Sequence, residues 1–405
     1  MKVLQVNCVY KKGSTGKITY DLHHKFLDMG IESVVCYGRG KKVNDVNTYK
    51  VCPEWYSKLN NLWSRFTGIM YGGCFFSTRS LIDIIKKEKP DVVHLQCING
   101  YFVNIYKLVD FLKKNKIKTL LTLHSEFMYT CGCGHAFECN MWRKENACGT
   151  KKCPRWRAET KSFFFDGTKR MLNKMKKAFD GFDEDLIVSS VSPWLMKHAK
   201  SSLVLGNKRH YVVFNGLDTD NFCPSDTEDL RKKQGLENKK IVFHVTPMFN
   251  SDPNYIKGGY YIIELAQMMP DVIFVIAGNY EAGIKVPSNI LLLGKVADQK
   301  MLSKYYSMAD VTVIASKRET FSMVTAESLC AGTPVVGFKA GGPENIAIKE
   351  FSTFVEYGDM VALKKAVTEF IDKRKNPEIA KIAKETYSSE KSAKNYIALY
   401  NELLK

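Results

Sequence analysis

The segment Glu319-Thr-Phe-Ser-Met-Val-Thr-Ala-Glu327 places two carboxylates eight positions apart, one in a polar turn and one inside the helix that this turn opens. Acids in these two positions can bind two parts of one ligand, such as a sugar and a ribose. Glu327 stands among apolar neighbours, where a carboxylate normally has a partner. The alternative is a solvent-facing loop acid followed by a helix-surface acid. The pattern favours nucleotide-sugar chemistry, with Glu319 as a candidate catalytic residue.

Lys257 is a basic residue that could serve the same ligand. It precedes Gly258-Gly259, after an expected strand at 241–245 and a polar loop, and an amphipathic helix follows. A lysine in this position can neutralise a departing diphosphate, whereas the alternative is a solvated lysine at a turn. Its position after a strand, which matches that of the two acids, favours a functional role.

Two further candidates follow early strands. The loop Lys12-Gly-Ser-Thr-Gly-Lys17 opens a helix whose free amides suit a phosphate, and Gly16 would let a ligand approach the backbone closely. Its spacing is neither a P-loop nor a dinucleotide fingerprint, and a common Gly-Ser turn is the alternative. His124 follows the strand expected at 119–123 and could reach a ligand there, or it could satisfy local backbone groups. With Glu319 and Lys257, it is a candidate catalytic residue.

A cysteine cluster comes next in the chain. Five of the twelve cysteines, with His135, gather between Cys131 and Cys153 in a loop-like, tryptophan-bearing stretch. Four of them could close a structural zinc site, although the gaps of five, eight and four residues lack the usual short Cys-x-x-Cys spacing. Free thiols or disulfides are the alternative. The four candidate ligands are Cys133, Cys139, Cys148 and Cys153.

These residues must be positioned by regular elements, and the chain shows many short apolar runs separated by helix-length intervals. Such a pattern predicts parallel sheets that are covered on both faces. We therefore expect an α/β protein that is doubly wound twice, with ligands bound in a cleft at the carboxyl ends of the strands. The expected strands are 3–6, 33–37, 92–95, 119–123, 186–191, 211–214, 241–245, 272–277, 290–293, 311–315 and 334–337.

The length of 405 residues also fits two domains rather than one. Turn residues around Asn215-Gly-Leu-Asp-Thr-Asp place the boundary near 195–225. We predict domains at 1–200 and 205–385. The helix expected at 386–405 would pack back on the first domain.

Composition limits the choice of partners and location. The net charge of +18 indicates anionic partners, whether nucleic acid, phosphorylated ligands or an anionic membrane surface. The chain opens as a buried strand rather than a signal peptide, and it holds no apolar run of about 18 residues. We expect a cytoplasmic protein, with peripheral attachment to the inner face of the plasma membrane as a candidate property.

Two aromatic and basic stretches bear on that attachment. The ranges 55–66 and 71–76 form one, and 161–166 with the lysine-rich helix expected at 170–179 forms the other. A helix that packs on the core and turns a solvated lysine face outward is the alternative. The membrane interpretation would place a lipid-linked acceptor beside this surface.

The chain resembles the retaining GT-B glycosyltransferases of family four over nearly its whole length. A narrower resemblance joins it to bacterial surface-polysaccharide transferases of the exopolysaccharide or colanic-acid type, through 94–101 and Leu123-His124 with the cysteines that follow. The motifs of the wider family are the two acids with Gly332-Thr-Pro-Val, Lys257-Gly, Asn215-Gly-Leu-Asp, Leu293-Gly-Lys-Val296 and Tyr305-Tyr-Ser-Met-Ala-Asp310.

The resemblance implies roles for the site residues. Glu319 would orient the donor sugar, Glu327 would hold the ribose, and Lys257 would face the diphosphate. The remaining implied contacts are the amides of Thr320, Phe321 and Ser322 on sugar and phosphate oxygens, backbone of Val296 on the base, and Asn99 and Tyr101 in the acceptor region. The family often has an arginine after the first strand of its second domain, where this chain reads His244-Val-Thr-Pro-Met-Phe249.

The resemblance also implies a reaction. A sugar would pass with retention, and without a catalytic metal or other cofactor, from a nucleotide-diphosphate sugar to a glycan or lipid-linked acceptor. The first domain would bind the acceptor and the second the donor. Two alternatives are a GT-B-fold epimerase or phosphorylase, and a zinc-stabilised nucleic-acid-binding protein. The second explains neither of the two strand series, and no nucleic-acid partner is expected because the basic residues form no recognition motif.

Overall fold

The structure is a computed structural model that describes residues 1–405 except 131, 144–147, 149–152 and 374–375. The described chain divides into two compact units. Unit 1 contains Met1–Phe214 and Ser392–Lys405, and unit 2 contains Asn215–Lys391. Within the described residues, no helix is both long and apolar enough to cross a membrane.

Unit 1 is built on a parallel sheet with the strand order β3-β2-β1-β4-β5-β6-β7. Its central strands are short and almost wholly buried, as expected for a sheet covered by helices on both faces. The strands are β1 (Lys2–Val9), β2 (Glu32–Arg39), β3 (Thr48–Lys50), β4 (Val92–Leu95), β5 (Thr119–Leu123), β6 (Leu186–Ser190) and β7 (Arg209–Val212).

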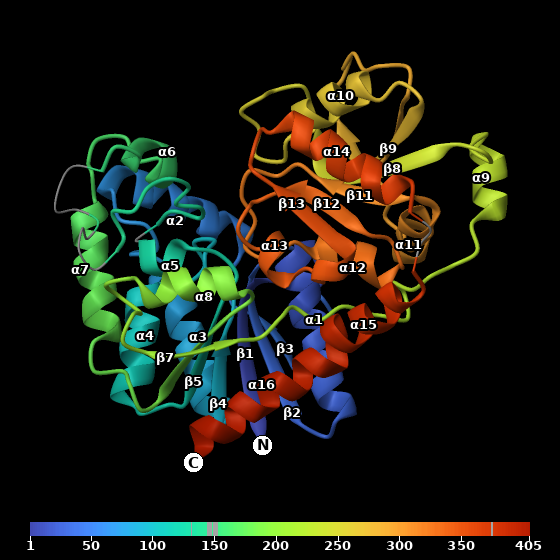
Figure 1. Cartoon of the computed structure of the whole chain (residues 1–405). Helices are drawn as coiled ribbons and strands as arrows, with labels where there is room; N and C mark the ends of the chain where they lie inside the picture. The colour runs from blue at the N-terminus through green and yellow to red at the C-terminus, as the bar shows by residue number, and fades with distance from the viewer. Residues whose placement is uncertain (131, 144–147, 149–152, 374–375) are drawn as a thin grey trace. The chain divides into compact units, whose positions relative to one another are not determined.

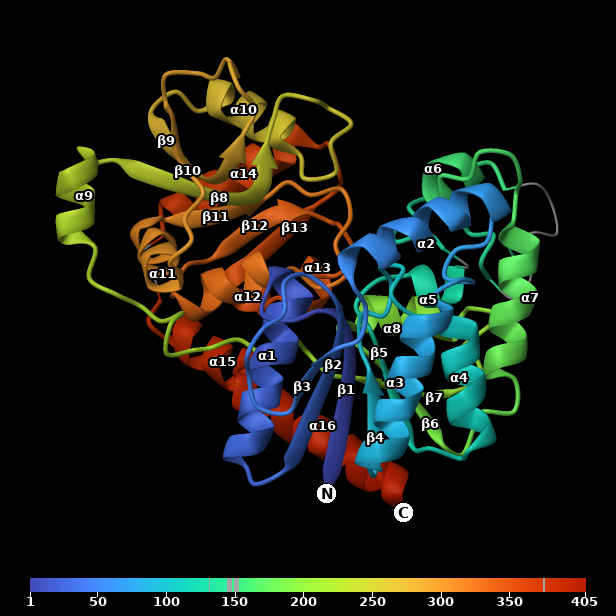
Figure 2. The same cartoon turned by 180° about the vertical axis from the view of Figure 1, so that it is seen from behind.

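Helices connect these strands and cover the sheet (Figures 1 and 2). Two of them begin at side-chain caps, since Asn104 accepts from the amide of Lys107 and Ser192 from that of Leu195. The helices are α1 (Gly13–Asp28), α2 (Glu54–Thr67), α3 (Phe75–Glu88), α4 (Ile105–Lys114), α5 (Phe127–Thr130), α6 (Trp156–Thr160), α7 (Thr168–Phe179), α8 (Pro193–Lys200) and α16 (Ser389–Leu404).

The end of the chain belongs to the core of unit 1. In α16, Tyr396, Tyr400 and Leu403 are buried in one cluster with Val3 and Phe26. The Tyr400 hydroxyl also lies 2.8 Å from Nδ1 of the buried His94 on β4. These contacts attach a helix from the end of the sequence to strands from its beginning.

Unit 2 is built on a second parallel sheet, with the strand order β10-β9-β8-β11-β12-β13. Helices α10 and α14 bury Ile262, Leu265 and Leu363 against Val242 and Phe274 of the strands. The strands are β8 (Lys240–Phe249), β9 (Val272–Tyr280), β10 (Ile290–Gly294), β11 (Val311–Ile314), β12 (Val335–Phe338) and β13 (Ser352–Val355). The helices are α9 (Glu228–Gln234), α10 (Gly259–Met268), α11 (Gln299–Met308), α12 (Met323–Cys330), α13 (Pro343–Ile346), η1 (Lys349–Phe351), α14 (Met360–Ile371) and α15 (Glu378–Tyr387).

The predicted fold class is confirmed, and every strand expected from the sequence is present. The strands β3 and β13 were not predicted, because each is short and only half-buried and so lacks a continuous apolar run. Strand β7 pairs with β6 and keeps the chain in unit 1 as far as Phe214, beyond the predicted end at residue 200.

Candidate functional site

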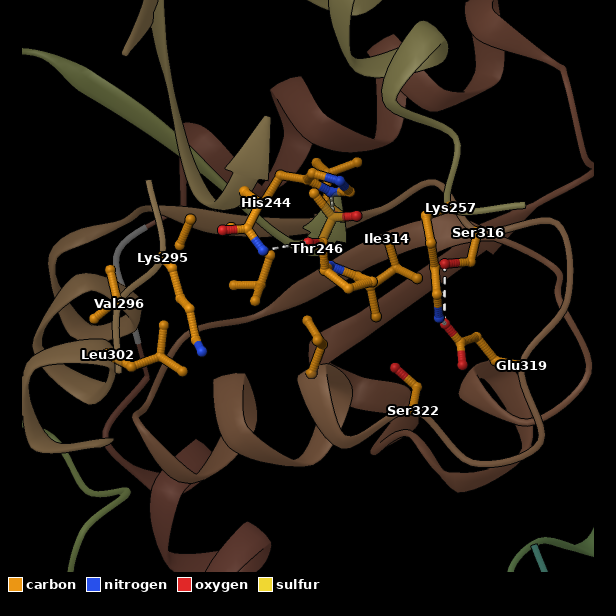
Figure 3. A pocket seen from close by; sticks show the side chains of 17 residues that line it. His244, Thr246, Lys257, Lys295, Val296, Leu302, Ile314, Ser316, Glu319 and Ser322 are labelled. Carbon is orange, nitrogen blue, oxygen red and sulfur yellow. Dashed lines mark hydrogen bonds and ion pairs between the residues drawn. The ribbon is translucent and has the colours of Figure 1, made fainter. Parts of the chain in front are cut away.

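The candidate site is a cavity of about 440 Å³ in unit 2, at the carboxyl ends of β8, β9 and β11. Its volume lies in the range of pockets that hold small organic ligands, and its position is the usual one for a ligand of a parallel sheet. Figure 3 shows the side chains that line it. They are His244, Val245, Thr246, Pro247, Lys257, Ala277, Gly278, Asn279, Lys295, Val296, Leu302, Val313, Ile314, Ser316, Glu319, Ser322 and Val324.

The two central strands shape the floor of the cavity. The pairing of β8 with β9 shifts register between Val245 and Met248, which is where both strands reach the cavity. Gly278 has a φ of +143°, and a Cβ atom there would lie 1.7 Å from the carbonyl oxygen of Thr246. Only glycine therefore allows the two backbones to run this close beneath a ligand.

Lys257 and Glu319 meet at one wall of the cavity. Nζ of Lys257 donates to Oε1 of Glu319 at 2.5 Å, and the Ser316 hydroxyl donates to the same oxygen at 3.0 Å. Both charged side chains are partly exposed, so they are open to a ligand as well as to each other. The sequence placed them 62 positions apart, and the fold makes them an ion pair.

The loops that carry this pair are fixed by backbone contacts. Gly258, which caps α10, has a φ of +70°, and a Cβ atom there would lie 2.1 Å from the carbonyl oxygen of Ala315. The amide of Lys317 also donates to the carbonyl oxygen of Ile256 at 2.8 Å. The Lys-Gly sequence thus has a structural reason, because the glycine lets the lysine loop lie directly against the end of β11.

The turn after Glu319 is supported from below by a second glycine. The amide of Gly342 donates to the carbonyl oxygen of Glu319 at 2.8 Å. A Cβ atom on Gly342 would lie 2.5 Å from the amide nitrogen of Phe321. Ser322 then adopts a φ of +81°, rare for a residue with a side chain, and its hydroxyl caps α12 by accepting from the Thr325 amide. This close contact gives the turn its shape at the cavity edge.

His244 is a buried residue in the cavity wall to which the sequence assigned no function. Its Nδ1 lies 2.9 Å from the carbonyl oxygen of Val313, so Nδ1 carries the proton and donates. Burial, followed by the nearby charge of Lys257, lowers the pKa of His244 to about 4 and keeps the ring neutral. Among the described residues, no group hydrogen-bonds to Nε2, which therefore offers an acceptor to a ligand hydroxyl or amino group.

Lys295 is the second basic residue at the cavity. Figure 3 places it with Val296 and Leu302 at the side opposite Lys257 and Glu319, and its amino group points into the cavity. Within the described part of the chain it forms no ion pair, so its charge is available to an anion. Lys295 was quoted in a motif but not predicted as a site residue. Its signal was a lysine two positions after the expected strand at 290–293.

Of the other residues predicted to contact the donor, only some line the cavity. Val296 and Ser322 line the cavity, whereas the lining does not include Thr320 or the buried Phe321. Glu327 is not in the lining either, and its carboxylate accepts from the buried Tyr306 hydroxyl at 2.9 Å. It follows Val324 by three positions on α12, hence on the same side of that helix as a lining residue.

The other predicted site residues belong to unit 1: the catalytic candidate His124, the donor candidate Gly16, and Asn99 and Tyr101 of the acceptor region. His124 directly follows β5, and burial lowers its pKa to about 4. Gly16 lies in the first turn of α1, where a Cβ atom would lie 3.0 Å from a methyl of Val9, so its close approach is to β1. Asn99 accepts from the Cys97 thiol at 2.7 Å. The Tyr101 ring lies 4.9 Å from that of Tyr71.

The predicted zinc site is not formed by the described residues. Cys133, Cys139, Cys148 and Cys153 do line one small pocket, together with Trp142 and Trp156. Within the described ranges, however, no three His, Cys, Asp or Glu side chains are grouped so that they could hold a metal ion. Burial raises the pKa of the half-buried thiols of Cys133 and Cys153. Cys131 lies outside the described residues.

Comparison with known sequences bears directly on unit 2. Residues 226–387, which include the cavity residues discussed above, match the sequence model of the family described as glycosyl transferases group 1. A putative colanic acid biosynthesis glycosyl transferase, WcaC of Escherichia coli K12, is 21% identical over 432 residues that cover 100% of both chains. An N-acetyl-α-D-glucosaminyl L-malate synthase of Bacillus anthracis is 23% identical and covers 56% of this chain and 62% of its own.

Solved structures match the whole fold at low sequence identity. Sucrose-phosphate synthase of Thermosynechococcus elongatus superposes with a TM-score of 0.66 at 15% identity, covering 100% of this chain and 99% of its own. HepE of Anabaena in complex with UDP gives a TM-score of 0.64 at 14% identity, covering 99% and 100%. Residues 226–387 of unit 2 are thus similar to the group 1 glycosyl transferases, and the whole chain shares the two-domain GT-B fold of these structures.

Proposed function

We propose that this protein is a glycosyltransferase that moves a sugar from a nucleotide-diphosphate donor to a glycan or lipid-linked acceptor during surface-polysaccharide synthesis. The observation that carries this proposal is one cavity holding the Lys257–Glu319 ion pair, the acceptor nitrogen of His244 and the charge of Lys295. A nucleotide-diphosphate sugar has what these groups bind, namely an anionic diphosphate flanked by a sugar and a ribose.

The residues would act mainly by binding and orientation. Lys257 and Lys295, on opposite sides of the cavity, would neutralise the diphosphate as it leaves. Glu319 would accept from a hydroxyl of the donor sugar once the phosphate competes for Lys257. His244 would accept from a second donor hydroxyl or amino group through Nε2. Such a site stabilises leaving-group charge and needs neither a metal ion nor a covalent nucleophile of its own.

The choice of acceptor rests on relatives rather than on this cavity. Support for surface polysaccharide comes from the WcaC protein, described as a putative transferase of colanic acid biosynthesis, which aligns over the full length of both chains. Support for a nucleotide donor comes from the HepE structures, which were solved with UDP and with UDP-glucose. In unit 1, His124 would be catalytic, Asn99 and Tyr101 would meet the acceptor, and Gly16 would lie near the donor. Their meeting with the unit 2 cavity across a cleft, and a cytoplasmic location, stay predictions.

A donor panel tests the proposal. Binding of UDP, GDP, ADP and their sugar conjugates to the full-length protein would be measured by calorimetry, with duplex DNA and RNA as controls. We expect one nucleoside diphosphate to bind in the micromolar range or better, and nucleic acid not to compete with it. Failure of every nucleotide in the panel, or competition by nucleic acid, would contradict the proposal.

The retaining mechanism and the independence from a metal ion are tested by following the transfer reaction and its product. With the selected donor and an extract of lipid-linked acceptors, NMR of the released disaccharide would show whether the anomeric configuration of the donor is retained. Transfer in the presence of EDTA should continue at the same rate, because the leaving charge is met by lysines. An inverted product would refute the retaining mechanism while leaving the donor site intact.

A further inference from the structure

Unit 1 exposes large apolar side chains from three separate segments. Several are far more exposed than is usual for their type, including Phe76 at 78%, Trp55 at 67% and Phe164 at 64%. We call this set the aromatic platform. It consists of Trp55, Leu59, Leu62, Trp63 and Phe66 on α2, Phe75 and Phe76 at the start of α3, and Phe163, Phe164 and Phe165 between α6 and α7.

The members of the aromatic platform form one surface. The ring of Phe66 lies 5.2 Å from that of Phe163 and 6.2 Å from that of Phe164, which joins α2 to the segment after α6. Tyr56 stands between Trp55 and Phe76, with ring separations of 5.6 and 5.8 Å, and so joins α2 to α3. Figures 1 and 2 both show α2 and α6 at the same end of unit 1.

Hydrogen bonds hold these segments in place. The amide of Phe163 and the hydroxyl of Ser162 both donate to the carbonyl oxygen of Arg65, at 2.8 and 3.2 Å. A Cβ atom on Gly167 would lie 1.8 Å from the carbonyl oxygen of Gly68, so the two chains touch backbone to backbone. The exposed phenylalanines are therefore presented by a fixed scaffold, and their exposure is a built feature of the surface.

The charge around the aromatic platform is mostly positive. Lys107 lies over the Phe75 ring at 4.6 Å. The exposed basic residues on the three segments and their flanks include Lys58, Arg79, Lys86, Lys87, Lys161, Lys169 and Arg170. Of the acids on these segments, Asp83 of α3 is exposed, whereas Glu54 and Asp166 have partners within unit 1. Glu54 forms an ion pair with Arg39, and Asp166 accepts from the amides of Cys153 and Thr168.

The aromatic platform lies beside the predicted acceptor loops of the same unit. Arg39, which pairs with the first residue of α2, also donates to the carbonyl oxygen of Gly100 at 3.2 Å. The ring of Tyr71, between α2 and α3, lies 4.9 Å from Tyr101 and 5.8 Å from Phe127, three residues past His124. A hydrophobic anchor bound here would thus be held next to the residues proposed to receive the acceptor.

We propose that the aromatic platform docks unit 1 on an anionic lipid bilayer, with the rings in the interface and the basic side chains on the headgroups. Tryptophan and phenylalanine bordered by lysine and arginine are the composition of interfacial membrane sites. A second copy of the chain fits less well, because a symmetric contact would bring the same basic residues face to face. Only the idea that the membrane presents the acceptor rests on the proposed function. The docking surface itself is argued from the residues of unit 1.

Vesicle binding by the full-length protein, without donor, tests the proposal. We expect sedimentation with vesicles of phosphatidylglycerol and phosphatidylcholine, weaker binding to phosphatidylcholine alone, and loss of binding as salt rises. The double variant Trp63→Glu/Phe164→Glu should bind about tenfold more weakly or worse. Val361→Glu, which charges a residue that is 76% exposed on α14 of unit 2, should bind as the wild type does.

Two further measurements distinguish a lipid bilayer from a second copy of the chain as the partner of the aromatic platform. Brominated lipids should quench the fluorescence of the wild type, and the variant Trp55→Phe/Trp63→Phe should lose most of that quenching while keeping its fold. If the wild type ignores anionic vesicles, or if the platform variant binds them unchanged, the proposal is wrong. It is equally wrong if the platform variant turns a solution dimer into a monomer, because the surface then joins two copies. None of these results depends on donor binding, which the nucleotide panel measures separately.

Discussion

Lys257 and Glu319 form an ion pair, with 2.5 Å between Nζ and Oε1, at one wall of the unit 2 cavity. The lysine comes from the loop before α10 and the acid from the loop before α12. Each therefore holds the other in the position that a donor would need. A bound diphosphate would take over the lysine, and the carboxylate would then be free to accept from the sugar.

Removing the lysine should damage leaving-group stabilisation. Lys257→Met is expected to lower the transfer rate by about 10²–10³-fold, the usual effect of deleting one group that meets developing negative charge. Initial rates with the donor selected by the panel would measure this. Lys339→Met is the matched control, because it breaks the Lys339–Glu356 pair, which is also in unit 2 but outside the cavity lining. Equal losses in both variants would argue that the effect is structural.

Replacing His244 by Phe should weaken donor binding by about 1–3 kcal/mol, since a donor hydroxyl or amino group would lose its acceptor on burial. With a pKa of about 4, the wild-type ring stays neutral between pH 6 and 8, and donor affinity should be flat over that range. Calorimetry at several pH values would check both points. An affinity that changes tenfold near pH 6.5 would mean that the histidine titrates in the site.

Glu327 can be tested through the ribose itself. If its carboxylate holds the ribose hydroxyls, the wild type should prefer the ribonucleotide donor to the 2′-deoxy or 3′-deoxy form. Glu327→Ala should remove about 1–3 kcal/mol of that preference. Tyr306→Phe, which deletes only the 2.9 Å hydrogen bond to this carboxylate, serves as the control for lost orientation. Unchanged ribose preference in Glu327→Ala would show that the acid has a structural role in α12.

Gly342→Ala should distort the Glu319 turn from beneath. The new methyl group would lie 2.5 Å from the Phe321 amide nitrogen and 2.6 Å from the Thr320 carbonyl oxygen, so the backbone must move. We expect donor affinity to fall by about tenfold or more, with a smaller loss of thermal stability. Gly134→Ala, in unit 1, puts a methyl group into open space and should change neither. An unchanged donor affinity would show that the shape of this turn does not contribute to donor binding.

Acid should destabilise unit 1 through His94. Burial, with a smaller effect from His124, lowers the pKa of His94 to about 3, whereas the unfolded side chain titrates at 6.5. Below 6.5 the unfolded chain therefore binds a proton that the folded chain does not. The contribution of His94 to the free energy of unfolding is therefore fully present above pH 6.5 and declines as the pH falls towards 3.

The variant His94→Gln measures that contribution. Between pH 7.5 and pH 5, the free energy of unfolding of this variant should fall by about 2 kcal/mol less than that of the wild type. Thermal unfolding at both pH values gives the difference within each protein, so any constant cost of the substitution cancels. Identical pH profiles would show that His94 does not account for the acid sensitivity.

The sequence was sufficient for the architecture because each buried parallel strand is a local signal. Val92–Leu95 and Thr119–Leu123 were predicted to the residue, since both are unbroken runs that the sheet buries completely. The same reasoning failed for Thr48–Lys50 and Ser352–Val355, which are half-buried edge strands whose pairing depends on neighbours already in place. Local pattern predicts an element well only where burial dominates its energy.

Within the site, the sequence alone determined that Glu319, Lys257 and Val296 stand where parallel strands end, because strand ends and turn glycines can be read locally. Only the tertiary structure decided that His244 and Lys295 join them, since the sheet order β10-β9-β8-β11 brings strands together that are distant in the sequence. It also showed that, among the described residues, the four cysteines are not grouped as metal ligands. Cysteine spacing shows that four thiols are close along the chain, but whether their sulfur atoms converge depends on how the loop packs around Trp142 and Trp156.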